Sequence, residues 1–402
     1  MAADSPQHQA VRSLYNTYPF PPEPLLAEPP PGYNWRWQWS AVHSFCKGTQ
    51  APSQRTRILD AGCGTGVGTE YLAHLNPEAE ITAIDLSDGA LAVARERLER
   101  SGVWREGVTL QALNLERAET LPGEFDYINC VGVLHHLPDP KAGIQALAKK
   151  LKPGGLFHIF VYAELGRWEI QLVQKAINLL QGKNRGDFRD GVAVGREIFA
   201  TLPPENRLVR RERERWSLEN HRDESFADMY VHPQETDYNI DTLFELIAAS
   251  GLQFIGFSNP DYWRLERVLG SSPLLMERAS ALSPLAQYRL IELLDPEITH
   301  YEFFLTKPPY QRETWEDDEA LRQAGAERHP CLTGWPSRSL FDYNYTPIEL
   351  TPEEFQFLQL CDAQPGATIA ELRRQAPLNL DQIRQLQRRQ LLILSPEKKE
   401  GF

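Results

Sequence analysis

From residue 55 onward the chain alternates short apolar runs with helical patterns, and this alternation restricts its fold more than any other feature of the sequence. The segments between the runs place apolar residues on one helical face, as Leu91, Ala94 and Leu98 do after an N-cap at Ser87 or Asp88. Strands that alternate with helices predict an α/β fold, in which helices cover both faces of a mainly parallel sheet. The apolar runs predicted to be its strands are Arg57–Leu59, Ile81–Ile84, Val108–Leu110, Tyr127–Cys130 and Leu156–Val161.

The same pattern returns near residue 240, after a stretch that does not follow it. A helix is predicted for Ile240–Ser250 and a strand for Leu252–Phe257. A last strand, His300–Thr306, is expected either at the edge of the sheet or inserted in it. Residues 163–235 are charged and irregular, so we interpret them as a helical insertion, and the charge run Arg210–Arg215 as a solvated helix face.

The two ends of the chain differ from the α/β region in composition. The first 50 residues are rich in proline and aromatic residues, which predicts an arm that either packs on the domain or covers an active site. Near the other end, Thr351 and Thr368 each precede a glutamate by three residues, the capping-box spacing that starts a helix. Three short helices and a strand predict a small winged-helix-like module there. We therefore expect an arm 1–50, an α/β domain 51–310, a linker 311–345 and the module 346–402.

The composition limits the partners of the chain. Its 55 acidic residues outnumber its 42 basic residues, and the net charge of −13 gives no general attraction to nucleic acids or anionic membranes. No apolar run is long enough to span a membrane, and the start Met1–Pro6 lacks the pattern of a secretory signal. Neither the five cysteines nor the histidines show metal-ligand spacing. We therefore expect a cytoplasmic protein without a metal, a membrane span or a nucleic-acid partner, whose terminal module docks on a protein partner or on the chain itself.

A glycine-rich turn follows the first predicted strand. Gly62, Gly64 and Gly66 occupy every second position, and Asp60 stands two residues before the first of them. Glycines at a strand-to-helix turn let the backbone approach a ligand, and α/β sheets bind their ligands at this edge. A dinucleotide-binding fingerprint would need a third glycine where the chain has Val67. The spacing therefore disfavours a nicotinamide- or flavin-dependent oxidoreductase.

Asp85 ends the second predicted strand, 19 residues after Gly66. A carboxylate at this place can accept hydrogen bonds from both ribose hydroxyls of a nucleoside. Taken singly, Asp85 is also explained as a helix cap, and the glycines as a tight turn. Taken together, the turn and the acid indicate a site for a nucleoside-containing cofactor.

The motif Leu59–Gly66 resembles the first motif of the class I S-adenosylmethionine-dependent methyltransferases, and the similarity covers about residues 51–310, most strongly up to residue 162. Phe125–Ile128, followed by Gly132–Leu137, resembles the branch that methylates quinones and other small molecules, and Lys152–Gly155 is a further feature of that branch. The resemblance implies a seven-stranded Rossmann-like sheet, S-adenosylmethionine as cofactor, and SN2 transfer of a methyl group to an oxygen, nitrogen or carbon acceptor.

The resemblance also implies which residues hold the cofactor. The backbone of Gly62–Gly66, with Cys63 as a small packed side chain, would line the amino-acid and ribose part, and Asp60 would hold the methionine ammonium group. Asp85 would accept the ribose hydroxyls, and Val131 would offer a backbone contact to the methionine moiety. Asn114 stands where many members have an acid, and it is also explained as a turn residue. The residues expected around the adenine are Leu86, Asn114 and Leu115.

Methyl transfer requires an acceptor lone pair in line with the bond that breaks, and a phenol, enol or acid as acceptor also needs a base. Histidine suits this task because its ordinary pKa lies near neutral pH. The candidates are His136 and His135, which follow the fourth strand, and His232, and each is also explained as a structural residue. Tyr15 and Tyr18 would close the site if the arm is a lid.

The leading hypothesis is therefore a methyltransferase with an unidentified small-molecule acceptor. Two alternatives remain open: a protein or peptide methyltransferase to which the terminal module brings its partner, and a cofactor-binding regulatory protein without turnover.

Overall fold

The structure, a computed structural model, describes residues 5–52 and 54–396, which group into two compact units. Residues 30–50 of the expected arm belong to the second unit, whereas its residues 5–29 belong to the first. The four-part division of the chain stays a prediction, and its parts at 1–4 and 397–402 lie outside the described residues. The first unit holds the chain up to Pro29, Thr56–Ala73 and Ala79–Pro308; the second holds Pro30–Arg55, His74–Glu78 and the chain from Pro309 on.

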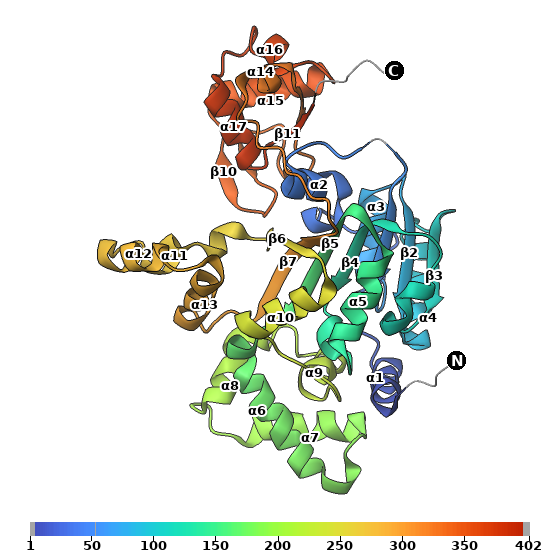
Figure 1. Cartoon of the computed structure of the whole chain (residues 1–402). Coiled ribbons are helices and arrows are strands. Elements are labelled where there is room, and N and C mark those ends of the chain that lie inside the picture. The colour runs from blue at the N-terminus through green and yellow to red at the C-terminus, as the bar shows by residue number, and fades with distance from the viewer. Residues whose placement is uncertain (1–4, 53, 397–402) are drawn as a thin grey trace. The chain divides into compact units, whose positions relative to one another are not determined.

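The first unit is built on a sheet whose described strands number seven, in the order β3-β2-β1-β4-β5-β7-β6 (Figure 1). Strands β1 to β5 are parallel to one another, and β7 lies between β5 and β6, antiparallel to both. The predicted α/β sheet is confirmed, and His300–Thr306 takes the inserted one of its two expected places. The strands are β1 (Arg57–Ala61), β2 (Glu80–Asp85), β3 (Val108–Ala112), β4 (Phe125–Val131), β5 (Leu151–Tyr162), β6 (Gln253–Phe257) and β7 (His300–Thr306).

Two helices of this unit begin or end at residues that the sequence predicts. Ser87 caps α4, since its side chain accepts a hydrogen bond from the backbone of Ala90, and Gly251 ends α10 in the left-handed conformation. One core joins a face of the sheet to α5 and α10 through residues such as Ile128 and Leu246. The helices are α1 (Pro6–Thr17), α3 (Val67–Leu75), α4 (Asp88–Arg100), α5 (Pro140–Lys150), α6 (Glu164–Gln181), α7 (Phe188–Thr201), α8 (Arg207–Arg211), α9 (Asp223–Tyr230), α10 (Ile240–Ser250), α11 (Leu265–Leu269), α12 (Pro273–Ser280) and α13 (Pro284–Leu294).

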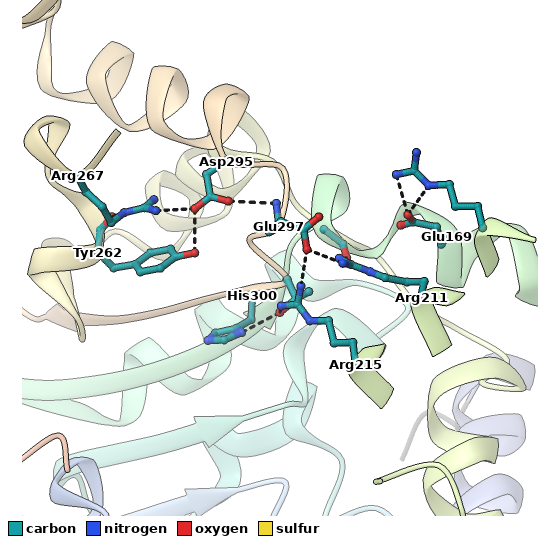
Figure 2. Close-up of polar contacts among 11 residues, drawn as sticks. Glu169, Arg211, Arg215, Tyr262, Arg267, Asp295, Glu297 and His300 are labelled. Carbon is teal, nitrogen blue, oxygen red and sulfur yellow. Dashed lines mark hydrogen bonds and ion pairs between the residues drawn. The ribbon is translucent and has the colours of Figure 1, made fainter. Parts of the chain in front are cut away.

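The insertion forms a core of its own, in which α6, α7 and α9 pack together with Leu14 of α1. Its charge run Arg210–Arg215 is not a fully solvated face, and this expectation was wrong in part. Arg211 and Arg215 converge on Glu297, and Arg215 also donates to Thr299 at 3.2 Å (Figure 2). Arg210, Arg213 and Glu214 are exposed, whereas Arg211 and Arg215 are half-buried and face Glu297 in the loop before β7.

The second unit has its own core, formed by apolar residues of the chain beyond Pro309. Apolar residues of α2 (Trp39–Lys47), such as Val42 and Cys46, are buried as well. Both predicted capping boxes are present, at Thr351 before α15 and at Thr368 before α16. The winged-helix-like interpretation of this part stays a prediction. Its other elements are α14 (Asp318–Gln323), α15 (Pro352–Ala363), α16 (Ile369–Leu372), α17 (Leu380–Arg388), β8 (Gly325–Arg328), β9 (Ser339–Phe341), β10 (Pro347–Glu349) and β11 (Leu392–Ser395).

Candidate active site

The glycine-rich turn leaves the carboxyl end of β1 in a conformation that needs glycine. Gly62, Gly64 and Gly66 have φ values of 83°, 52° and 84°. A Cβ on Gly62 would lie 2.3 Å from Val133 Cγ2, and one on Gly66 would lie 2.8 Å from Ala94 Cβ. Any larger residue would therefore displace the turn from the strands and helix that it joins.

Asp85 is tied to this turn at the tip of β2. Its Oδ2 accepts a hydrogen bond from the backbone N–H of Gly64 at 2.8 Å, and its Oδ1 accepts one from Ser87 N–H at 2.8 Å. Burial raises the pKa of the Asp85 carboxyl, although these backbone donors oppose the shift. Each carboxylate oxygen has a second lone pair, so Asp85 can still accept from a ligand beside the turn.

Asp60 is buried behind the turn and has two partners. Thr69 donates to its Oδ2 at 2.6 Å, and the amide of Asn129 donates to its Oδ1 at 2.8 Å. Burial raises the pKa of Asp60, while both hydrogen bonds lower it. The carboxylate is therefore held in one orientation before any ligand arrives.

A polar chain that sequence reasoning missed continues from Asn129 across the sheet. His158 Nδ1 donates to the Asn129 side-chain oxygen at 2.8 Å, and His158 Nε2 lies 3.1 Å from Glu302 Oε1. Ser258 donates to the other oxygen of Glu302 at 2.5 Å. The four side chains, with Asp60, link β1, β4, β5, β7 and the end of β6, and only the strand register reveals them.

The other residues predicted to bind the cofactor lie around this edge. The Asn114 side chain accepts from Glu116 N–H at 3.0 Å and caps the turn that follows β3, as its alternative interpretation expects, while Leu115 is buried in the core. Val131 ends β4 half-buried, and burial raises the pKa of the Cys63 thiol, in keeping with a packed side chain. Their contacts with a cofactor stay predictions.

Helix α1 lies against the loop after β2. Arg12 Nε donates to the carbonyl of Leu86 at 3.0 Å, and Asn16 Oδ1 accepts from Ser87 Oγ at 2.7 Å and from Gly89 N–H at 3.1 Å. At the other end of α1, His8 Nε2 lies 3.1 Å from Glu116 Oε1. The start of the chain is thus fastened beside both loops at which an adenosine is expected.

The segment after α1, residues 20–24, is fastened to the glycine turn as a strap. Thr65 N–H donates to the carbonyl of Phe20 at 3.1 Å. The buried guanidinium of Arg97 donates to the carbonyls of Thr65, Pro24 and Glu23 at 2.9, 3.0 and 2.7 Å. Its carboxylate neighbour is the buried Glu70, at 3.5 Å. Neither Arg97 nor the strap was predicted, because their bonds end on backbone carbonyls that carry no sequence signal.

All three predicted catalytic histidines are buried and meet in one cluster. The rings of His136 and His232 stack with centroids 3.7 Å apart, and the His135 ring lies 4.1 Å from His136 and 4.0 Å from Tyr162. Burial lowers the pKa of His136 to about 4, and burial lowers those of His135 and His232 well below the ordinary value. The cluster is therefore uncharged at neutral pH.

The main chain of Gln234 holds the two stacked histidines in opposite tautomers. Its carbonyl lies 3.1 Å from His136 Nδ1 and can only accept, so this nitrogen carries the hydrogen and His136 Nε2 has a lone pair. Its N–H donates to His232 Nδ1 at 3.1 Å, so that nitrogen has the lone pair and His232 Nε2 carries the hydrogen. This Nε2–H and both ring nitrogens of His135 have no hydrogen-bond partner within 5–52 and 54–396.

Acidic and phenolic groups surround the cluster. Tyr15 of α1 lies 5.6 Å from His232, ring to ring, and donates to buried Asp228 at 2.8 Å, whereas the half-buried Tyr18 packs against the apolar core of the insertion. Burial raises the pKa of Asp228, and the neighbouring His136 opposes that shift. The Arg167 guanidinium lies 3.4 Å from the centre of the Tyr162 ring. Tyr15 thus connects the arm to the groups around the histidines.

His232 also lines a cavity of about 160 Å³ inside the insertion. The wall combines the apolar side chains of Ile177, Phe188 and Val231 with the polar or charged side chains of Asn178, Gln181 and Arg185. A cavity of this size and lining admits a small molecule or a single side chain. Among the described residues, no group of three or more His, Cys, Asp or Glu side chains is arranged to hold a metal ion.

Known proteins resemble the chain both in sequence and in structure. A family model described as a methyltransferase domain matches residues 59–157. An uncharacterized protein of Synechococcus sp. is 58% identical over 390 residues, 96% of this chain and 93% of that protein. The ubiquinone biosynthesis O-methyltransferase of Thiobacillus denitrificans is 41% identical over 108 residues, which are 27% of this chain and 44% of that enzyme. The chain is a class I S-adenosylmethionine-dependent methyltransferase.

The solved structures agree with this family at the level of the fold. PKMT2 from Rickettsia typhi, also solved in complex with AdoHcy, aligns with a TM-score of 0.61 at 14% identity and covers 91% of this chain and 76% of its own. The cofactor of the methyltransferase is S-adenosylmethionine. The residues present fit this group, because the carboxylates of Asp60 and Asp85 stand beside a turn whose three glycines have no room for a side chain.

Proposed function

We propose that the methyltransferase transfers its methyl group to a small molecule that binds at the histidine cluster. The observation that supports this most directly is that His232 both stacks on His136 and lines the cavity in the insertion. An acceptor in that cavity would have one end beside the histidines that follow β4. The cluster itself is buried, which does not suit a folded protein as acceptor.

The site would act first by alignment. When bound, S-adenosylmethionine supplies a methyl group that is already electrophilic because its sulfur carries a positive charge. Holding the acceptor in line with that bond can lower the barrier by roughly 7–11 kcal/mol. The strap at residues 20–24 and Tyr15 of α1 would exclude water from the reacting groups, as the lid interpretation of the arm expects.

His136 would serve as the general base, because its Nε2 has a free lone pair. Burial holds its pKa at about 4, so the ring is neutral at pH 7 and its lone pair is not blocked by a proton. Asp228 favours the protonated form of His136 electrostatically and would stabilise the charge that proton transfer creates. A general base of this kind contributes typically 10²–10⁴-fold to the rate, an order-of-magnitude figure.

The proposal is tested by following a tritiated methyl group. Purified protein is incubated with methyl-labelled S-adenosylmethionine and with an extract of cells that lack the gene, and the extract is then separated by size. Label in the small-molecule fraction is expected. Label confined to protein would favour the alternative of a protein or peptide acceptor, and no transfer at all would favour a regulatory protein without turnover.

The remaining expectations concern partners and place in the cell. Within the described residues no helix has the length and apolarity that a membrane crossing requires. A cytoplasmic location, and docking of a protein partner or of the chain itself through the terminal module, stay predictions.

A further inference from the structure

We infer that the segment between β6 and β7 is a surface at which the chain pairs with a second copy of itself. Helices α11, α12 and α13 of this segment project away from the sheet of the first unit (Figure 1). We call residues 261–295 the projection. The inference is independent of the proposed function, because neither the glycine turn nor the histidine cluster takes part in it.

The base of the projection is fixed to the rest of the unit. Trp263 stacks on Phe257 of β6, with the ring centres 4.0 Å apart. After α13, the Asp295 carboxylate accepts from the Tyr262 hydroxyl at 2.9 Å and pairs with the Arg267 guanidinium of α11 at 2.7 Å (Figure 2). The projection is thus held at both of its ends and presents one defined outer surface.

That outer surface is rich in leucine. Six leucines of the projection each expose between 36% and 61% of their surface. Single exposed apolar residues are ordinary, but a group of this size on neighbouring helices is typical of an interaction site. Covering the group would remove apolar surface from water, which favours association. The six are Leu274, Leu275, Leu282, Leu285, Leu293 and Leu294.

The charge of the projection indicates which kind of partner covers it. It holds five acidic residues and four arginines, so it is almost neutral in a chain whose net charge is −13. Helices that lie on a membrane surface usually carry an excess of Lys and Arg around their apolar face, and the projection has none. Two copies of so acidic a chain repel each other in general, and a nearly neutral surface is where that repulsion is weakest.

Two charged side chains of the projection remain available to a partner. Glu277 and Arg278, neighbours on α12, are exposed and form no ion pair within the described residues. The buried Glu292 accepts from the backbone N–H of Ile240 at 3.1 Å. The other charges are paired within the chain: Arg264 with Asp261 and Glu266, Arg267 with Asp295, and Arg289 with Asp241.

These two charges are complementary to those of a second copy. When two α12 helices pack antiparallel about a two-fold axis, Glu277 of each copy faces Arg278 of the other, so that the contact contains two opposite-charge pairs. Leu274 lies one helical turn before Arg278 and therefore on the same face of α12. The same arrangement thus brings the exposed leucines of both copies together.

The oligomeric state of the full-length protein tests the inference. Sedimentation over a series of concentrations should show a monomer in equilibrium with a dimer. Leu274→Glu should raise the dissociation constant of the dimer by about tenfold or more, because each dimer loses two apolar contacts. Leu218→Glu, at an exposed leucine outside the projection, is the matched control and should leave the constant unchanged. A monomer at every concentration, or an equal effect of both substitutions, would overturn the inference.

An exchange of charges tests whether the partner is a second copy. Glu277→Arg and Arg278→Glu each replace two attractive pairs by two repulsive ones, so either variant alone should dimerise about tenfold more weakly. A mixture of the two variants should form a heterodimer, and the variant with both substitutions should dimerise like the unaltered protein. Recovery in neither would refute the antiparallel pairing of α12.

A lipid surface is tested as the competing occupant. The unaltered protein and Leu274→Glu are each mixed with phosphatidylcholine vesicles and separated by flotation. Neither protein should float with the vesicles. Flotation of the unaltered protein alone would assign the leucines to a lipid surface and refute the inference, and the proposed function would stand in either case.

Discussion

The side-chain oxygen of Asn129 accepts a hydrogen bond from His158 Nδ1 at 2.8 Å, and through this contact the Asp60 carboxylate is linked to the Glu302 carboxylate three strands away in the sheet. Asn129 can donate to Asp60 only while its oxygen faces His158. The histidine therefore fixes which way the amide is turned, and with it one of the two donors that orient Asp60. A residue far from the glycine turn would in this way determine how the site meets a positively charged group.

The first prediction concerns His158→Ala. It should weaken binding of S-adenosylhomocysteine by about tenfold, since a hydrogen bond to a charged group contributes about 1.5–3 kcal/mol. Binding of 5′-methylthioadenosine, which lacks the amino-acid part and its ammonium group, should change little. Calorimetric titration with both ligands measures the difference. An equal loss for both would show a general structural defect, and His300→Ala, at an exposed ring of β7, is the control.

Asp85→Asn, unlike His158→Ala, should weaken the binding of both ligands alike. Asp85 is expected at the ribose, which both ligands possess, so each should bind about tenfold more weakly. The substitution keeps the side chain's size and its acceptor oxygen for one of the two backbone donors, Gly64 and Ser87, which limits damage to the turn. Unchanged affinity for either ligand, measured in the same titrations, would remove the ribose role of Asp85.

The attachment of the strap, residues 20–24, to the glycine turn should depend on Arg97. Arg97→Ala leaves three backbone carbonyls and the buried Glu70 carboxylate without their partner, and removal of one member of a buried ion pair costs about 3–5 kcal/mol. Urea unfolding should show a loss of this size. Adding Glu70→Gln should restore part of it, because the uncompensated charge is then gone. A loss below about 1 kcal/mol would mean that Arg97 is solvated in the folded protein.

The sequence predicted those parts of the molecule that depend on the spacing of residues close together in the chain. The strands, the glycine turn and Asp85 were found in this way, because each belongs to a short sequence pattern. The three histidines were named singly, and the structure brings them together, but their tautomers are set by the main chain of Gln234, which any residue except proline would provide. The chain from Asp60 to Glu302 depends on how strands distant in sequence align, which no local pattern specifies.

The last prediction follows from the lowered pKa of His136. Folded His136 has a pKa of about 4 against an ordinary value of 6.5, so between these pH values the unfolded chain binds the proton and the folded chain does not. Stability is therefore complete above pH 6.5 and decreases as the pH falls towards 4, by about 3 kcal/mol for this group. His136→Gln removes the group, so its free energy of unfolding should depend less on pH over that range. Urea unfolding of both proteins at several pH values measures the two slopes. Other buried histidines titrate in both proteins alike, so only the difference between the slopes reports on His136. Parallel slopes would show that the pKa of His136 is the same in the folded and the unfolded chain, so that burial does not lower it.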